Sequence, residues 1–319
     1  MGLCQSGEPS RHRARVTTKI VAIGGGHGLQ ATVQAALLLS TDVTAIVSVA
    51  DDGGSSGRLR EEFNVLPPGD LRMALTAMAP PSVIKNLWMH RFEGQGALAG
   101  HSVGNLMLTA LWQQSDPVTG LQQAAVALDV RGVVLPVSLQ PHHLHAVVEG
   151  ENGERVDLFG QAQIARCTDN ILSLTTVPGD ITAAAEALTA IRDASVILLG
   201  PGSWYTSVLA PLLVPGVIEA ISESIARLAL ITNVRDVNGT HIGREGSEVT
   251  VADYIESLRR CAPGVSPSVI ICDDSDASTS WQALDFPVIH SRIRTAHGAV
   301  HDPPALARTL RDWLSSTGA

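Results

Sequence analysis

The sequence is poor in cysteine and in aromatic residues. Its four cysteines, Cys4, Cys167, Cys261 and Cys272, are widely separated and form no Cys-x-x-Cys pair. This spacing indicates neither a disulfide framework nor a zinc cluster, so we expect a protein of the reducing cytoplasm. Aromatic side chains make up only 3% of the chain. The core must therefore consist mainly of Leu, Val, Ile and Ala, which suit buried parallel strands.

Excess positive charge and long apolar runs are also missing. The chain has 22 Lys and Arg against 31 Asp and Glu, a net charge of -9, so we expect no nucleic-acid partner and no anionic membrane surface. No apolar run reaches the ~18 residues of a membrane span. Residues 1–17 are polar and Arg-rich, and we expect a disordered arm there. Residues 1–6 match a myristoylation pattern, but the match is too short to outweigh that expectation.

What the sequence does contain is a repeated order of short apolar run, glycine-rich loop and helix. The run 19–23 leads into glycines at 24–28 and a helix over 29–39, and a second strand follows at 43–49. Two parallel strands joined by a helix form a right-handed βαβ unit, and ligands bind at the carboxyl edge of such sheets. The same pattern predicts further strands at 195–199, 228–232, 268–272 and 288–290, and further helices at 182–192, 251–261 and 304–314.

Between these regions the chain changes character. Short β-like runs at 133–138, 144–148, 156–159 and 171–176 are separated by Gly, Asn and Pro. The sequence thus predicts one α/β domain over 18–319, with a doubly wound, mostly parallel Rossmann-like sheet and a small β-rich insertion at about 131–180. His143 and His145 would share one face of a strand in this insertion. Without a nearby Asp, Glu or Cys, a solvent-facing strand is favoured over a metal site.

The most informative segment is Asp51-Asp52-Gly53-Gly54-Ser55-Ser56-Gly57-Arg58-Leu59-Arg60, which follows the second strand. Its glycines allow a ligand to approach the backbone, its hydroxyls and arginines can bind phosphate, and its two carboxylates can hold a hydroxyl or a metal. A solvated turn is the alternative. We interpret the segment as a binding loop at the carboxyl edge of the sheet.

Three further polar positions fall at predicted helix starts. Asp70 follows Pro67-Pro68-Gly69 and is either a helix cap or a site residue. His101 and Asn105 lie at the start of the helix that continues from 100–105. They form either an anion pocket or buried structural contacts. Ser203 and its neighbours in 200–207 form a third glycine-hydroxyl loop, in which the hydroxyls cap a helix continuing to 213, bind phosphate, or do both.

Known nucleotide motifs narrow the ligand. Residues 26–31 fit G-x-G-x-x-A, and Asp51 lies 20 residues beyond Ala31, as in a dinucleotide fold. The acid that binds ribose normally ends its strand, whereas Asp51 opens a glycine, serine and arginine segment, which argues against NAD. No Gly-Lys-Ser/Thr follows the glycines, and no Gly-x-Ser-x-Gly elbow occurs at 200–207, so a P-loop is excluded and a serine hydrolase disfavoured. The spacing favours a phosphorylated ligand without naming it.

Taken together, several segments resemble the YvcK family of gluconeogenesis factors over most of the chain, from Lys19 to Pro304. The resemblance is carried by the motifs Ile23-Gly24-Gly25-Gly26-His27-Gly28, the segment 51–60, Pro67-Pro68-Gly69-Asp70-Leu71-Arg72, the segment 101–105 and Gly200-Pro201-Gly202-Ser203. It implies binding of UDP-sugars such as UDP-N-acetylglucosamine, with roles in cell shape and in growth on gluconeogenic carbon sources. The family shares its fold with CofD, a 2-phospho-L-lactate transferase that uses a guanylylated donor and Mg²⁺.

The resemblance also implies roles for individual residues. Gly25, Gly26 and Gly28 would contact the nucleotide phosphates, and Gly202 and Ser203 would belong to the same pocket. Asp51 and Asp52 would correspond to the acidic pair of CofD, and Asp70 to a further acid. His27 stands where many members have Thr, which puts any regulation through that threonine in doubt. Residues 233–240 are also looser than the Pro-Gly-Glu-Thr sequence usual in the family.

Two functions follow as hypotheses. In the first, which the resemblance favours, the protein is a nucleotide-sugar-binding regulator without turnover. In the second, it is a CofD-like transferase in which Asp51, Asp52 and Asp70 are catalytic and Asp51 and Asp52 can hold Mg²⁺. The expected partners are the UDP-sugar and further copies of the chain. The predicted ligand-binding residues are Gly25, Gly26, His27, Gly28, Asp51, Asp52, Gly53, Ser55, Ser56, Arg58, Arg60, Asp70, His101, Asn105, Gly202 and Ser203.

Overall fold

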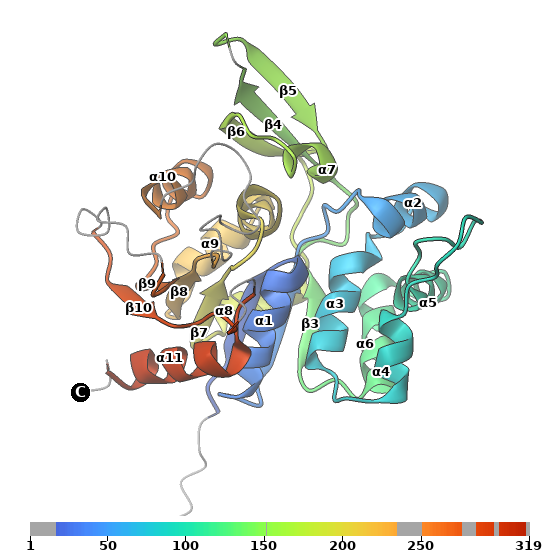
Figure 1. The fold of residues 1–319 in the computed structure, drawn as a ribbon, viewed down its shortest axis with the longest axis horizontal. Coiled ribbons are helices and arrows are strands. Elements are labelled where there is room, and N and C mark those ends of the chain that lie inside the picture. Colours follow the sequence, from blue (N-terminus) through green and yellow to red (C-terminus); the bar gives the residue numbers. More distant parts are fainter. Residues whose placement is uncertain (1–16, 151, 235–250, 276–284, 297–299, 317–319) are drawn as a thin grey trace, which may run out of the picture.

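The computed structural model describes residues 17–150, 152–234, 251–275, 285–296 and 300–316, and within them one large parallel sheet forms the centre of the fold (Figure 1). Its strand order is β10-β9-β8-β7-β1-β2-β3, and helices flank it. The strands are β1 (Ile20–Gly24), β2 (Val43–Val47), β3 (Val133–Pro136), β7 (Val196–Leu199), β8 (Arg227–Ile231), β9 (Val269–Asp273) and β10 (Val288–Ser291). All their pairings are parallel, which confirms the predicted doubly wound α/β fold.

The central strands are apolar on both sides. Every residue of β1, β7 and β9 is buried. A parallel sheet covered by helices on its faces requires such unbroken apolar strands, because neither face meets water. The abundance of small aliphatic residues in the sequence is therefore used at the centre of the sheet.

The helices agree with the sequence pattern where the pattern was strong. They are α1 (Gly26–Leu37), α2 (Gly54–Phe63), α3 (Pro68–Met78), α4 (Val83–Met89), α5 (Val103–Trp112), α6 (Pro117–Leu128), α7 (Gln161–Ile164), α8 (Ala185–Arg192), α9 (Val217–Glu223), α10 (Val251–Cys261) and α11 (Pro303–Ser316). The predicted helix continuing to residue 213 is instead a π-helix, η1 (Trp204–Leu209), followed by a 3₁₀ turn, η2 (Ala210–Leu213). Among the described residues no single helix is long and apolar enough to cross a membrane, although Trp204–Leu213 and Val217–Glu223 meet the length and composition limits as a pair bent by 77°.

The order of the strands defines where a ligand can bind. From β1 the chain adds β2 and β3 on one side and then returns to the other side of β1 to add β7, β8, β9 and β10. The direction of winding thus reverses between β1 and β7. In open α/β sheets a crevice forms outside the carboxyl ends of the two strands at this reversal.

The β-rich insertion is smaller than predicted. Its antiparallel sheet has the order β5-β4-β6, formed by β4 (His143–Glu149), β5 (Arg155–Phe159) and β6 (Asn170–Val177), and it projects from the rest of the fold (Figure 1). The run at 133–138 was assigned to this insertion, but β3 pairs in parallel with β2 in the large sheet. The partner of β3 lies more than 80 residues earlier in the chain, so local sequence did not reveal the pairing.

Some sequence predictions fall on other parts of the chain. The myristoylation-like residues 1–6, nearly all of the predicted arm, and the family-divergent residues 235–240 lie outside the described residues.

Candidate functional site

A cavity of about 300 Å³ lies at the carboxyl ends of β1, β7 and β8, where the winding direction reverses. We call it the glycine cavity. Most of the residues that line it come from the loops and helix starts directly after these strands. They are Gly25, Gly26, His27, Gly28, Ala31, Asp70, Gln161, Pro201, Gly202, Ser203, Ser207, Asn233, Val234, Val300 and His301. The structure thus brings seven of the predicted site residues together: Gly25, Gly26, His27, Gly28, Asp70, Gly202 and Ser203.

Glycines are required here by close approach. A Cβ atom on Gly28 would overlap the backbone carbonyl of Pro201, and one on Gly25 would lie 2.5 Å from Oδ2 of Asp70. Gly28 therefore lets the loop after β1 touch the loop after β7, and Gly25 makes room for a carboxylate. Gly26 has open space around it but takes a φ of +59°, a conformation that glycine adopts without strain.

The start of α1 faces this cavity. Its N-cap, Gly25, has no side chain, and no acidic residue occurs in its first turn. The first amides of a helix have no intrahelical acceptor, and the helix dipole is positive at this end. The Gly26 amide donates to Asp70. His27 and Gly28 bring the neighbouring amides to the cavity wall, an arrangement that suits a phosphate or another anion.

The loop after β7 is fixed by a side chain from the end of β8. Asn233 accepts a hydrogen bond from the Gly202 amide at 2.9 Å and donates one to the Gly202 carbonyl at 2.7 Å. Thr32 of α1 donates to the Gly200 carbonyl at 2.8 Å. The predicted cap role of Ser203 is wrong, because its side chain makes no cap hydrogen bond to η1. Ser203 lines the glycine cavity instead.

Asp70 lines the glycine cavity and is not the N-cap of α3. The N-cap of α3 is Pro67, and Asp70 lies in the first turn of the helix. Burial and the neighbouring charge of Asp51 raise the pKa of Asp70 to about 7, although the Gly26 amide and Arg72 act in the opposite direction. A carboxyl group with this pKa can hold or release a proton near neutral pH.

Asp51 is the acidic neighbour of Asp70. Burial raises its pKa as well, against hydrogen bonds from the Gly53 amide and Ser56. The Gly53 amide donates to Asp51 at 2.9 Å. The charge of Asp51 in turn raises the pKa of Asp70, so a cation near both carboxyl groups would favour their ionised forms.

Asp52 contacts the insertion. Its Oδ1 accepts a hydrogen bond from the Ala162 amide of α7 at 2.8 Å, and its Oδ2 lies 3.9 Å from Nδ1 of His143. A Cβ atom on Gly160 would overlap the same carboxylate. Asp52 therefore fastens the insertion to the large sheet, whereas Asp51 also acts on Asp70, which lines the glycine cavity.

The segment predicted as a binding loop is mostly helical. Gly53 is the N-cap of α2, which runs from Gly54, because Gly, Ser and Arg in this order also provide a helix start and a polar helix face. Ser56 is buried and accepts a hydrogen bond from the Gly69 amide at 3.1 Å. Only its first residues, Asp51 to Gly53, form the connection after β2.

His101 and Asn105 join α5 to α2. His101 Nδ1 lies 2.9 Å from the Ser55 hydroxyl, and the Asn105 amide donates to the same hydroxyl at 3.0 Å. All three residues are buried, and burial lowers the pKa of His101. This contact between two helices is structural, and the glycine cavity is not lined by Ser55, His101 or Asn105.

A second cavity, of about 700 Å³, lies between α2 and the start of the insertion. We call it the arginine cavity. Its lining residues come from one face of α2, from the preceding turn and from the chain entering β4. They are Asp52, Gly54, Gly57, Arg58, Arg60, Glu61, Asn64, Pro141 and His143. The predicted residues Asp52, Arg58 and Arg60 are therefore grouped here and not at the glycine cavity.

Sequence reasoning missed several residues of the glycine cavity. Gln161 comes from the insertion and His301 from the segment before α11. Asn233 belongs to the segment 233–240, which was noted for its divergence from the family sequence. Its position directly after β8 was the signal that could have placed it at the carboxyl edge of the sheet. For Gln161 and His301 no motif or strand-end position marked the residue.

His301 is held in place by a buried network. Its Nε2 donates to the Thr232 carbonyl at 2.9 Å, and burial lowers its pKa to about 4, against the effects of Thr232 and Asp273. The ring is therefore neutral near pH 7. The backbone of His301 forms an isolated antiparallel β-bridge with that of Arg294.

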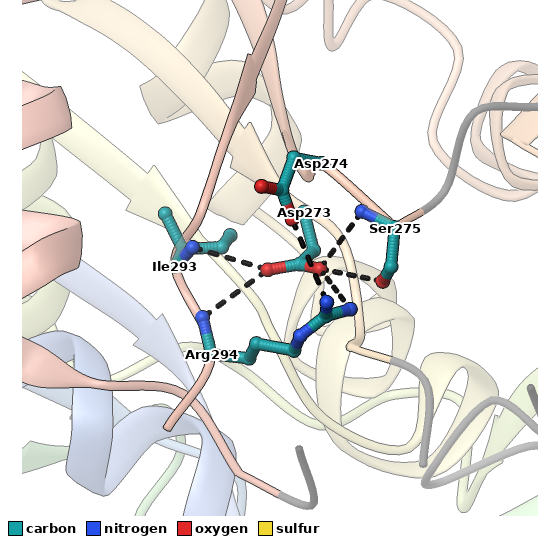
Figure 2. Close-up of polar contacts among 5 residues, drawn as sticks. All are labelled: Asp273, Asp274, Ser275, Ile293 and Arg294. Carbon is teal, nitrogen blue, oxygen red and sulfur yellow. Dashed lines mark hydrogen bonds and ion pairs between the residues drawn. The ribbon is translucent and has the colours of Figure 1, made fainter. Parts of the chain in front are cut away.

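Asp273 organises this segment at the end of β9 (Figure 2). Its fully buried carboxylate accepts from the amides of Ile293 and Arg294 at 3.1 and 3.2 Å and from Arg294 Nη1 at 2.7 Å. Ser275 donates to it from both its amide and its hydroxyl. Burial alone would raise the pKa of Asp273, but these hydrogen bonds and the charge of Arg294 lower it.

The described residues contain no group of three or more His, Cys, Asp and Glu side chains arranged to hold a metal. In the insertion, His145 binds Asp157 at 2.7 Å and stacks on Phe159. Asp51 and Asp70 supply two carboxylates. Mg²⁺ is commonly held by one or two carboxylates, with substrate phosphates and water as its other ligands, and this donor set fits that pattern.

The fold defines an α/β protein with a doubly wound sheet, and the lining of the glycine cavity at the carboxyl edge of this sheet suits an anionic ligand. The sequence model of the family described as "2-phospho-L-lactate transferase CofD" matches residues 20–294, and the chain belongs to this CofD family.

Its relatives carry a different name. The chain is 45% identical to a Mycobacterium leprae protein named "Putative gluconeogenesis factor", over 91% of this chain and 84% of that one. It is 39% identical to a Halalkalibacterium halodurans protein named "Gluconeogenesis factor", over 79% of this chain and 76% of that one. A crystal structure of a UPF0052-family protein from Bacillus halodurans superposes with a TM-score of 0.81 at 34% identity, covering 92% of this chain and 99% of the other.

Proposed function

We propose that the protein is a gluconeogenesis factor that binds a nucleotide sugar of the UDP-N-acetylglucosamine type in the glycine cavity and acts as a regulator of cell shape and carbon use. The observation that carries the proposal is the cavity itself. It lies at the reversal between β1 and β7, and the start of α1 faces it with His27 and Gly28. A volume of about 300 Å³ is within the range of small-molecule sites.

The lining chemistry supports a diphosphate joined to neutral polar groups. The amides at the start of α1 and the residues of the loop after β7 suit the phosphates. Gln161 Oε1 is buried and makes no hydrogen bond to the described residues, so it can accept one from a base or an acetamido group. Asn233 and Ser203 provide further polar groups for sugar hydroxyls.

Calorimetric titration of UDP-N-acetylglucosamine into the full chain tests the proposal. We expect saturable binding that persists in EDTA. Gln161→Ala should weaken it about tenfold, the loss of one buried hydrogen bond to a ligand. Gln163→Ala, on the same short helix but outside the lining, serves as the control. Absence of binding to the wild-type chain, or equal affinities for all three proteins, would contradict the proposal.

The second candidate is a CofD-like transfer reaction, favoured by the family match and by the proximity of Asp51 and Asp70. These two carboxylates would hold Mg²⁺, which supplies charge neutralisation at a diphosphate. Bound Mg²⁺ would favour the ionised form of Asp70, whose pKa is raised to about 7 by burial and by Asp51 in the chain alone. The uncharged lining around the start of α1 would orient the phosphates.

Product analysis separates the two functions. Incubation with UDP-N-acetylglucosamine or a guanylylated donor, with Mg²⁺ and with EDTA, is followed by chromatography of the nucleotides. A regulator leaves the nucleotide unchanged under all conditions. Release of free nucleotide, with water accepting the rest of the donor, that requires Mg²⁺ and is lost in Asp70→Asn would establish catalysis at these carboxylates in its place.

A further inference from the structure

The arginine cavity is a second compartment on the far side of the Asp51–Asp52 turn. Asp51 interacts with Asp70 at the glycine cavity, whereas Asp52 lines the arginine cavity. Gly54, Gly57 and Glu61 recur along α2 at spacings of three and four, so they lie on one helix face. Gly54 has open space where a side chain would stand, whereas a Cβ atom on Gly57 would overlap the backbone of Asp52, so Gly57 allows α2 to pack closely against the turn.

Arg60 is the unusual residue of this cavity. Only 9% of its surface is exposed, and its Nη1 has no hydrogen-bond partner among the described residues. Asp52 and Asp51 balance its charge electrostatically, but neither occupies Nη1. Leaving a charged donor buried and unpaired is costly, so a turn of the Arg60 side chain that brings Nη1 to an acceptor in the cavity would relieve an existing penalty.

The other charged groups define what can bind. Arg58 donates through Nη2 to the Ala99 carbonyl at 2.7 Å and has four further N–H donors. His143 lies on the opposite wall, and burial and Arg60 lower its pKa. Glu61 and Asp52 are the acids, but Glu61 is exposed and Asp52 Oδ1 already accepts from Ala162. Guanidinium donors in a partly enclosed groove suit a planar or tetrahedral oxyanion.

We propose that the arginine cavity binds an oxyanion group, phosphate or carboxylate, of a small molecule distinct from the ligand of the glycine cavity, with the Arg60 guanidinium as the central donor. The proposal goes beyond the nucleotide-sugar function and does not depend on it. Its test contains no nucleotide, so the two proposals can fail separately.

Titration of inorganic phosphate and of malonate into the full chain, followed by calorimetry, is the test. We expect saturable binding of one or both anions, and the tighter of the two identifies the group. Arg60→Met should reduce that affinity at least tenfold, because it removes the donor and keeps the aliphatic stem. Arg308→Met removes an exposed arginine from α11 and should leave the affinity unchanged.

A second pair of variants covers the possibility that Arg60→Met does not fold. Asn64 is exposed at the mouth of the cavity, with a φ of +50°, which Asp also tolerates. Asn64→Asp should therefore keep the fold and weaken anion binding at least threefold. Gln123→Glu makes the same change of charge on an exposed position of α6 and should have no effect.

The glycine cavity is the competing location for the anion. His27→Glu places a negative charge there and should leave the Arg60-dependent binding intact. If the wild-type chain binds neither anion, or if His27→Glu abolishes all binding while Arg60→Met and Asn64→Asp do not alter it, the proposal is overturned.

Discussion

The two cavities on either side of the Asp51–Asp52 turn are built from different materials. The glycine cavity is lined by backbone and mostly uncharged side chains, and its described lining residues include no Lys or Arg. The arginine cavity is lined by side chains, among them Arg58 and Arg60. A backbone site depends on how closely loops approach each other, whereas a side-chain site depends on single charges. The two should therefore respond differently to substitution, pH and added anions.

The largest expected difference comes from Asp273, which fixes the segment that carries His301 into the glycine cavity. Asp273→Ala leaves Arg294 partly buried without its partner, and we expect a loss of ~3–5 kcal/mol in the free energy of unfolding. Nucleotide-sugar affinity should fall, while phosphate binding at the arginine cavity should persist. Urea denaturation and the two titrations measure these effects.

Asp274 provides the matched control. It also contacts Arg294, at 3.8 Å, but its side chain is 49% exposed. Asp274→Ala should cost less than ~1 kcal/mol. Equal losses of stability for the two variants would show that the network at Asp273 does not hold the cavity wall.

The second prediction tests the close approach of two loops. Gly28→Ala forces a methyl group against the Pro201 carbonyl, so we expect a destabilisation of ~1–3 kcal/mol and a large loss of nucleotide-sugar affinity. Gly96→Ala has open space around it and no positive φ, and it should be neutral or slightly stabilising. Thermal denaturation and calorimetry compare the two, and a silent Gly28→Ala would refute the tight contact.

The third prediction concerns pH and belongs to the glycine cavity. The folded pKa of Asp70 is about 7, against ~3.9 in the unfolded chain. Between these values the folded state holds the proton that the unfolded state has lost, so Asp70 lowers stability as pH rises from about 4 to 7. Asp70→Asn should remove this slope and gain about 1 kcal/mol or more at pH 8 relative to wild type.

Urea denaturation at pH 5, 6, 7 and 8 checks the sign. His301, whose pKa is lowered to about 4, contributes the opposite slope between about 4 and 6.5, but it is present in both proteins and cancels in their difference. The exposed Asp42→Asn is the control. A difference between Asp70→Asn and wild type that does not change with pH would contradict the raised pKa.

The contrast between the cavities also shows what sequence can reveal. The glycine cavity was largely predictable, because Gly25, Gly28 and Gly202 follow apolar strands and strand ends gather at one edge of a parallel sheet. The arginine cavity could not be predicted, because the position of Arg60 depends on α2 being a helix. The glycines and serines of this segment are typical of a loop, so the sequence did not indicate the helix. The separation of Asp51 from Asp52 depends on α7, more than 100 residues away in sequence.

The smallest expected effect tests that separation. Asp52→Ala removes the acceptor for the Ala162 amide, a single hydrogen bond worth ~0.5–1.5 kcal/mol, and should loosen α7 against the turn after β2. Asp52→Asn keeps an acceptor oxygen and should restore most of the contact. Hydrogen–deuterium exchange of residues 161–165 should therefore rise in Asp52→Ala and stay near wild type in Asp52→Asn. Faster exchange in both variants would mean that the charge of Asp52, and not its hydrogen bond, holds the insertion. Unchanged exchange in both would show that Asp52 does not fasten the insertion to the large sheet.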